Sequence, residues 1–204
     1  MPNFDGSLFE RTQISSAVTV DDAAAFFREH GIFYCADANI AKEAEKSGIQ
    51  TLRDPKYLKE FRLGDPRLAR ILETYEPSYT YVLGPHRGAF YSCSVKPNED
   101  HANQATVFMW TKPTQLEFFP ESHIGPLRGV SASNGLYQIP YSWCRTKPWI
   151  KDEAEKERLK EILVEMDGGG VLIVHPRMTF AVQEGFAIAY GCRKRDEGGP
   201  DPPQ

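Results

Sequence analysis

The sequence predicts a mainly β protein, a double-stranded β-helix (jelly roll) with helices at its N-terminal end. Helical patterns occupy the first third of the chain, and short runs rich in Tyr, Val and Phe follow residue 77 at close intervals. Helices followed by many short strands are typical of a two-sheet jelly roll backed by helices. We expect a single domain over residues 1–197, followed by a disordered Gly- and Pro-rich tail over 198–204.

Composition and charge exclude several classes of function. The formal charge of −4 and the pI near 5.8 give no basic footprint, so we expect no nucleic-acid partner. No apolar run approaches the roughly 20 residues that span a bilayer, and we expect no membrane partner and a cytoplasmic location. The four cysteines lie far apart in the sequence, which favours free buried thiols over disulfides.

The helices are predicted from caps, apolar stripes and stops. Thr19 or Asp21 is expected to cap the first helix, and Asp65 followed by Pro66 is a strong start for the third. Apolar residues at helical spacing predict the fourth helix, within a highly charged segment. The four predicted ranges are 21–30, 39–47, 66–75 and 152–166.

The strands are predicted from β-branched and aromatic runs bounded by Gly and Pro. The central pair is 104–110 and 114–119, joined by a turn at 111–113 and ended by a Pro-Glu-Ser-His corner at 120–123. Proline cannot donate a hydrogen bond to a β ladder, so Pro113 and Pro120 each end a run. The other predicted strands are 32–35, 78–83, 88–95, 136–139, 171–174, 179–182 and 186–190.

Two stretches resemble one family. A strand ending in Trp110, a short second strand and the Pro-Glu-Ser-His corner are similar to the middle of the phytanoyl-CoA dioxygenase-like branch of the Fe(II) and 2-oxoglutarate oxygenases. The run from Gly169 to Phe180 resembles that family's Gly-Asp-…-His-Pro-x-x-x-His segment. The resemblance implies a cupin-like jelly roll in which two histidines and one carboxylate hold Fe(II).

The residues at the matching functional positions differ from the family pattern. No histidine of this sequence is followed two positions later by a carboxylate, so the His-x-Asp pair of the family is absent. Its place falls near Ser92 and Ser94, or on Tyr91 and Cys93 if the loop length differs. The second ligand histidine falls on Phe180, and Ala187 stands where the family's arginine holds 2-oxoglutarate. His175 matches an upstream histidine that does not bind metal.

We therefore expect a pseudoenzyme with no cofactor and no metal, which binds an apolar small-molecule metabolite. It could also serve as the non-catalytic partner of an active oxygenase, in a homo- or hetero-oligomer. The resemblance to short fungal relatives favours a setting in secondary metabolism. An apolar pocket with a few polar groups is the usual small-molecule site, and its expected lining is Phe90, Ser92, Ser94, Trp110, Phe180, Tyr79, Tyr81 and Arg145.

Two alternatives remain open from the sequence. One is a cofactor-independent isomerase, cyclase or lyase that uses acid–base residues in the vacated pocket, with Glu117, Tyr91 and His175 as catalytic candidates. Glu117 lies between Leu116 and Phe118 on an alternating strand, and the alternation allows it to point either inward or to solvent. The other alternative is a non-haem iron enzyme whose ligands come from His86, His101, His123, His175 and Glu117.

Overall fold

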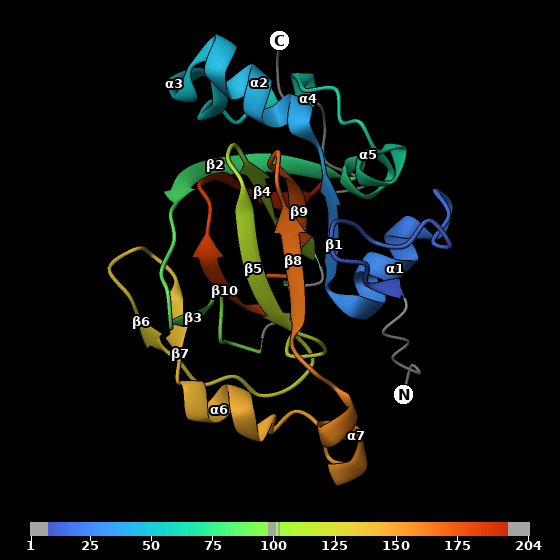
Figure 1. Cartoon of the computed structure of the whole chain (residues 1–204), viewed down its shortest axis with the longest axis vertical. Coiled ribbons are helices and arrows are strands. Elements are labelled where there is room, and N and C mark those ends of the chain that lie inside the picture. The colour runs from blue at the N-terminus through green and yellow to red at the C-terminus, as the bar shows by residue number, and fades with distance from the viewer. Residues whose placement is uncertain (1–7, 98–100, 102, 196–204) are drawn as a thin grey trace.

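The computed structural model describes residues 8–97, 101 and 103–195, and shows two antiparallel β-sheets packed face to face (Figure 1). The five-stranded sheet has the order β1-β9-β4-β11-β2, and the six-stranded sheet has the order β6-β7-β3-β10-β5-β8. This is the predicted mainly β jelly roll. The predicted disordered tail, 198–204, lies outside the described residues.

Eleven strands form the two sheets in the described part of the chain. Their bounds are β1 Ile32–Ala36, β2 Tyr75–Leu83, β3 Phe90–Ser92, β4 Gln104–Trp110, β5 Thr114–Phe119, β6 Val130–Ser131, β7 Tyr137–Ile139, β8 Ile162–Met166, β9 Gly170–Val174, β10 Thr179–Glu184 and β11 Ala187–Lys194. The predicted central pair is confirmed residue for residue as β4 and β5.

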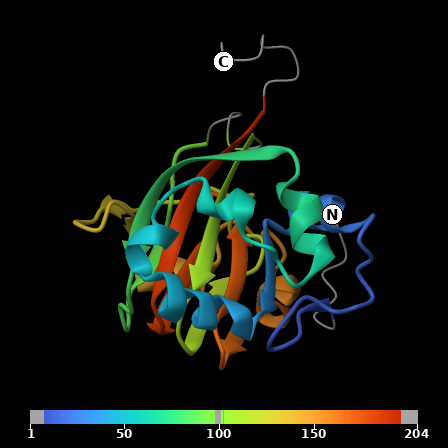
Figure 2. The ribbon, with the colours of Figure 1, turned by 90° about the horizontal axis from the view of Figure 1, so that it is seen from above.

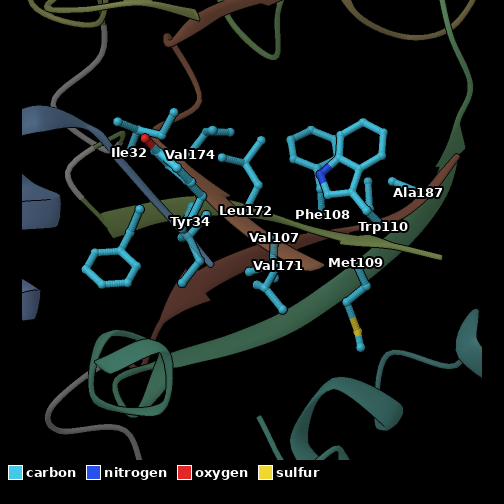
Figure 3. Close-up of a cluster of buried hydrophobic side chains, with 14 of the residues drawn as sticks. Ile32, Tyr34, Val107, Phe108, Met109, Trp110, Val171, Leu172, Val174 and Ala187 are labelled. Atoms are coloured by element: carbon cyan, nitrogen blue, oxygen red, sulfur yellow. The ribbon is translucent and has the colours of Figure 1, made fainter. Parts of the chain in front are cut away.

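Strand β4 divides its side chains between two environments. Phe108 and Trp110 point into the space between the sheets, whereas Val107 and Met109 point toward the helices on the other face (Figure 3). All four are fully buried, because helices cover the outer face of this sheet. Burial on both faces explains the continuous apolar run in the sequence.

Helices α2 to α5 lie over the outer face of the five-stranded sheet (Figure 2). The Tyr190 hydroxyl on β11 donates to the Leu52 carbonyl, and the Thr80 hydroxyl on β2 donates to the Arg53 carbonyl at 2.8 Å. The bounds of the first five helices are α1 Ala23–His30, α2 Ala38–Ser47, α3 Ile49–Leu52, α4 Tyr57–Glu60 and α5 Pro66–Leu72. Within the described ranges no helix is long and apolar enough to cross a membrane.

The predicted cap of α5 is confirmed. The Asp65 carboxylate accepts from the Arg67 backbone N–H at 2.8 Å and pairs with the Arg67 guanidinium at 2.7 Å. The cap expected for α1 is wrong, because the N-cap residue is Asp22. Asp22 makes no side-chain cap hydrogen bond and is instead held by the Thr19 hydroxyl.

We expect Asp65→Ala to lower the free energy of unfolding by about 2 kcal/mol, the upper end of the range for a lost N-cap. The reason is that Arg67, whose side chain is only 10% exposed, also loses its carboxylate partner. Urea unfolding followed by circular dichroism measures this. The matched variant Asp21→Ala removes an exposed carboxylate and should change stability by less than about 0.5 kcal/mol; equal effects would contradict the assignment.

The predicted helix over 152–166 is wrong in its second half. The helix α7 (Glu153–Arg158) ends early, and β8 pairs antiparallel with β5 from Ile162 opposite Phe118 to Met166 opposite Thr114. Val164 and Met166 are fully buried while their neighbours are half-buried, which is the period of a strand. Pairing with β5 therefore overrides the local helical spacing.

Smaller differences concern ends and loops. Helix α5 stops at Leu72 and Tyr75 already belongs to β2, so Pro77 lies inside a strand. That position is tolerated because β2 is the edge strand of its sheet. Strand β3 is shorter than the predicted 88–95. The long segment after residue 124 contains β6, β7 and the helix α6 (Tyr141–Thr146), of which only β7 was predicted.

Candidate functional site

The two sheets open at the end where β2 and β4 begin and where β3, β5 and β9 end. Two small cavities lie there and share Tyr79 and Cys93 as lining residues. The larger, of about 210 Å³, is also lined by Tyr81, Asn134 and Leu136. The smaller, of about 120 Å³, extends along the starts of β2 and β4 and includes Ser94 and Thr106. We call this region the barrel mouth.

Tyr79 is placed in the barrel mouth by a close approach of two strands. It lies opposite Gly191 on β11, and a Cβ on Gly191 would come within 2.1 Å of the Tyr79 ring. Only glycine leaves room for the ring to lie flat over the neighbouring strand. Tyr79 also stacks on Tyr81, with ring centroids 6.3 Å apart.

Cys93 lies at the centre of the barrel mouth, between two hydroxyls. The Thr106 hydroxyl donates to Cys93 Sγ at 3.5 Å, and the Tyr81 hydroxyl is 3.7 Å from the same sulfur. Burial raises the pKa of the Cys93 thiol, and the two hydroxyls oppose that rise. Burial, followed by the charge of Cys93, raises the pKa of Tyr81 well above its usual value. Both groups are therefore protonated at neutral pH and can donate hydrogen bonds.

We expect Thr106→Val to slow alkylation of Cys93 several-fold at pH 8. Removing a hydroxyl that favours the thiolate raises the pKa of Cys93 further, and only the thiolate reacts. Iodoacetamide labelling followed by peptide mass spectrometry reports each cysteine separately. Cys35, which is distant from Thr106 along the fold, is the internal control. An unchanged rate of Cys93 labelling would show that the hydroxyl does not stabilise the thiolate.

The interior behind the barrel mouth is filled by aromatic rings. Phe180 on β10 lies directly opposite Tyr91 on β3, so the two side chains share the inner face of the six-stranded sheet. Phe108 contacts Phe180 edge-on, with ring centroids 5.4 Å apart, and Trp110 stacks on Phe108. Ala187 is paired with Trp110 and lies next to it in Figure 3. Tyr91, Phe180 and Trp110 are therefore core residues, each at most 4% exposed.

Phe90, which the sequence suggested as a pocket residue, does not line the barrel mouth. It lies on the outer face of the six-stranded sheet, where it contacts Phe119 edge-on at 5.0 Å and stacks on Tyr141 of α6 at 5.6 Å. Alternation along β3 turns Tyr91 inward and Phe90 outward. Arg145 also belongs to this outer side, since its guanidinium lies over the Tyr141 ring. The unpredicted α6 explains both errors, because it covers an outer apolar patch that the sequence placed inside.

Glu117 also lies outside the barrel. It is opposite Ala181, a residue of the outer apolar cluster, and lines a surface depression with Arg87 and Gln115. Of its two orientations allowed by the sequence, the structure has the outward one. Glu117 therefore has no access to a ligand in the barrel mouth.

Ser92 and Ser94 join two strands at the rim of the barrel mouth. The Ser92 hydroxyl donates to the Pro176 carbonyl at 3.0 Å, and the Ser94 backbone N–H donates to the same carbonyl at 2.8 Å. Ser92 is fully buried, so it serves this structural link. Ser94 lines the smaller cavity.

Three histidines gather beside the barrel mouth. The rings of His123 and His175 are 5.3 Å apart, and those of His101 and His175 are 6.1 Å apart. Burial lowers the pKa of His123 to about 4. Burial, then the neighbouring His123, His101 and Arg177, lowers the pKa of His175 to about 3. The His175 ring nitrogen Nδ1 accepts from the Arg177 backbone N–H at 3.1 Å, which favours a structural role at this strand end.

This histidine cluster does not form a metal site. Across the described residues, no group of three or more His, Cys, Asp or Glu side chains could hold a metal ion. His86 and Glu117 lie apart from the cluster: His86 is exposed and packs edge-on against Tyr91. Of the site residues considered from the sequence, the structure therefore brings Tyr79, Tyr81 and Ser94 together. It adds Cys93, Thr106 and Leu136, of which only Cys93 had a sequence signal, through its spacing from Tyr91.

Sequence comparison gives no relatives, but structural comparison does. No model of a known protein family matches the chain, and no curated protein matches it either. A solved structure of EvdO2 from Micromonospora carbonacea var. aurantiaca, complexed with 2-oxoglutarate, has a TM-score of 0.53 at 13% identity, over 94% of this chain and 97% of that one. The epimerase SnoN, in complex with Fe3+, alpha-ketoglutarate and nogalamycin RO, has a TM-score of 0.51 at 12% identity, over 91% and 93%.

The chain shares the cupin-like jelly-roll fold of these structures. The apo form of the non-heme monooxygenase ThoJ also shares it, with a TM-score of 0.50 at 14% identity over 85% of this chain and 77% of that one. Agreement over nearly the whole chain confirms the oxygenase-like jelly roll. Identities this low extend to the fold alone and do not separate the phytanoyl-CoA dioxygenase-like branch from other oxygenase-fold proteins.

Proposed function

We propose that this oxygenase-fold protein has exchanged its iron and 2-oxoglutarate ligands for core residues and binds an apolar small molecule in the barrel mouth. The observation that carries the proposal is the pairing of Tyr91 with Phe180 on the inner face of β3 and β10. The family resemblance places the first ligand histidine near the end of one strand and the second at Phe180. Pairing with Phe180 favours Tyr91, and hence Cys93, over Ser92 and Ser94 as the matching positions.

The side chains at these positions do not fit the group that the fold implies. A facial iron site needs two imidazoles and one carboxylate, whereas Tyr91, Cys93 and Phe180 offer a phenol, a protonated thiol and a phenyl ring. Ala187 offers no charge to a dicarboxylate. We therefore derive no step through iron or 2-oxoglutarate.

The barrel mouth favours a ligand with an apolar body and a hydrogen-bond acceptor. Leu136 and the Tyr79 ring supply apolar surface, and the protonated Tyr81 hydroxyl supplies a donor. A carbonyl compound matches this combination. SnoN is described as coming from nogalamycin biosynthesis, and the sequence resembles short fungal relatives of the oxygenases. Secondary metabolism is therefore a suitable setting for such a ligand.

Acetophenone and ethylbenzene test this site, because they share size and shape but only acetophenone has a carbonyl. We expect acetophenone to shift the amide resonances of Cys93 and Thr106 and to bind several-fold more tightly than ethylbenzene. Tyr81→Phe should reduce acetophenone affinity to that of ethylbenzene and leave ethylbenzene unchanged. Stoichiometric iron in protein purified without chelator, with iron supplied, would contradict the proposal.

A cofactor-independent isomerase, cyclase or lyase is the second candidate. The approach of the Tyr81 hydroxyl to Cys93 Sγ favours it, because a phenol with a raised pKa is a suitable general acid toward a carbonyl oxygen. Tyr81 replaces Glu117 and His175 as the acid–base candidate. Turnover of a metabolite after dialysis against chelator, lost in Tyr81→Phe, would support this activity.

Association with an active oxygenase is a further proposal for the same chain. The edge strand β2 exposes 57% of Tyr79 and 39% of Val82, and its outer edge has no strand partner in the described residues. An exposed strand edge can add a strand from another chain. Size-exclusion chromatography with a paired oxygenase tests it, with Val82→Lys expected to abolish co-elution.

A further inference from the structure

A separate cavity lies on the helix-covered face of the five-stranded sheet, at the end of β2 away from Leu83. It has a volume of about 400 Å³, within the range of small-molecule sites, and lies where α4 and α5 meet the ends of β2 and β11. Figure 2 shows these helices over that face of the sheet. Its apolar lining is Leu58, Phe61, Leu63, Leu72, Tyr75 and Cys192. We call it the outer groove.

Three cations line one side of the outer groove: Lys59, Arg62 and Arg195. Two carboxylates nearby are already paired. Glu76 is 3.1 Å from Lys59 and 3.0 Å from Arg195, and Glu73 is 2.5 Å from Arg70. The lining of the outer groove itself carries three cations and one carboxylate, Glu73, although the chain as a whole carries a net charge of −4. Glu43 and Glu60 lie beside Arg62 in the adjoining depression.

Arg62 is the cation that remains available in the outer groove. It is exposed, and it makes no hydrogen bond or ion pair with any residue in the described ranges. Arg62 lies between Phe61 and Leu63 in the sequence. Both apolar side chains are half-buried against the core and line the groove. An apolar floor therefore adjoins an unpaired guanidinium, and a guanidinium can bind both oxygens of a carboxylate at once.

We propose that the outer groove binds an apolar monocarboxylic acid. The hydrocarbon part lies against Phe61, Leu63 and Leu72, and the carboxylate pairs with Arg62. A neutral apolar compound would contact the apolar surface but could not pair with the Arg62 guanidinium, and a cation would be repelled by it. The site differs from the barrel mouth, because its lining comes from α4, α5 and the ends of β2 and β11, and Cys192 is the one lining residue that the two sites share. Its test is therefore independent of the function proposed above.

Three probes with the same chain and different head groups test the proposal: octanoate, octan-1-ol and octyltrimethylammonium. Binding is followed by amide chemical shifts of the full-length protein. We expect octanoate to shift resonances of Phe61, Leu63 and Leu72 and to bind about fivefold more tightly than octan-1-ol, the scale of an exposed ion pair. The cation should bind more weakly than the alcohol.

Two variants separate the charge from the apolar floor. Arg62→Gln should lower octanoate affinity about fivefold and leave octan-1-ol unchanged, whereas Leu63→Ser should weaken both probes alike. The matched control Arg53→Gln removes an exposed arginine outside the groove and should change neither. Equal binding of all three probes, or shifts at Cys93 and Thr106 in place of the groove, would overturn the proposal.

Two other occupants have their own outcomes. The sequence beyond Arg195 begins with Asp196 and Glu197, so a chain ending at Arg195 that binds octanoate much more tightly would assign the groove to the protein's own terminus. A dimer that octanoate dissociates in sedimentation experiments would assign it to a second copy. Either result would overturn the small-molecule assignment.

Discussion

Lowering the pH from 7 to 4 should reduce the free energy of unfolding by several kcal/mol. The folded-state pKa values of His123 and His175 lie at about 4 and about 3, below the unfolded value of 6.5. Below pH 6.5 the unfolded chain therefore binds protons that the folded chain does not, and each histidine removes about 1.4 kcal/mol per pH unit. The loss continues until the folded pKa is reached. Urea unfolding at a series of pH values measures it.

His123→Gln identifies the source of this pH dependence. Glutamine does not titrate and can still donate to the Glu29 carbonyl, as His123 does. We expect the variant to lose about 3 kcal/mol of the pH dependence between 6.5 and 4. His86→Gln replaces an exposed histidine and should keep the wild-type curve. A curve for His123→Gln that matches wild type would show that other groups cause the acid sensitivity.

The triple variant Tyr91→His, Cys93→Asp, Phe180→His should bind one Co(II) per chain, where the wild-type chain binds none at the same concentration. These three side chains share one face of the paired strands, so they would bring two imidazoles and a carboxylate together. Metal analysis and the visible absorption of Co(II) report the stoichiometry and coordination. This experiment tests the correspondence with the oxygenase positions directly.

The control has the same three residue types in the other register: Ser92→His, Ser94→Asp, Phe180→His. Because Ser92 lies on the opposite face of β3 from Tyr91, this variant should not bind Co(II) tightly. Stoichiometric Co(II) in the control alone would reverse the correspondence. Failure of both variants, each with the circular dichroism of the wild type, would remove the structural basis for an exchanged iron site.

The sequence predicts those elements whose local signals and tertiary environment agree. The β4–β5 pair is bounded by prolines and α5 by a strong cap, and both agree with the structure. For residues 162–166 the spacing favours a helix, but the free edge of β5 offers backbone partners that no local pattern reveals. The same limit applies to α6, whose apolar partners Phe90 and Phe119 lie far away in sequence.

For the candidate site, sequence defines which residues alternate together but not which set faces inward. Tyr91 in β3 and Cys93, just after this strand, belong to the inner cluster, and Phe90 belongs to the outer one. Choosing between them requires the pairing with Phe180, which depends on the length of the connecting loops. The resemblance left both registers open for that reason. The sequence does not predict the outer groove, because its lining residues come from four separate elements.

The Pro176 carbonyl, which accepts from both Ser92 and Ser94, ties the end of β3 to the β9–β10 turn. Both of these hydrogen bonds join uncharged groups. These uncharged contacts fix the spacing between the end of β3 and the β9–β10 turn at the rim.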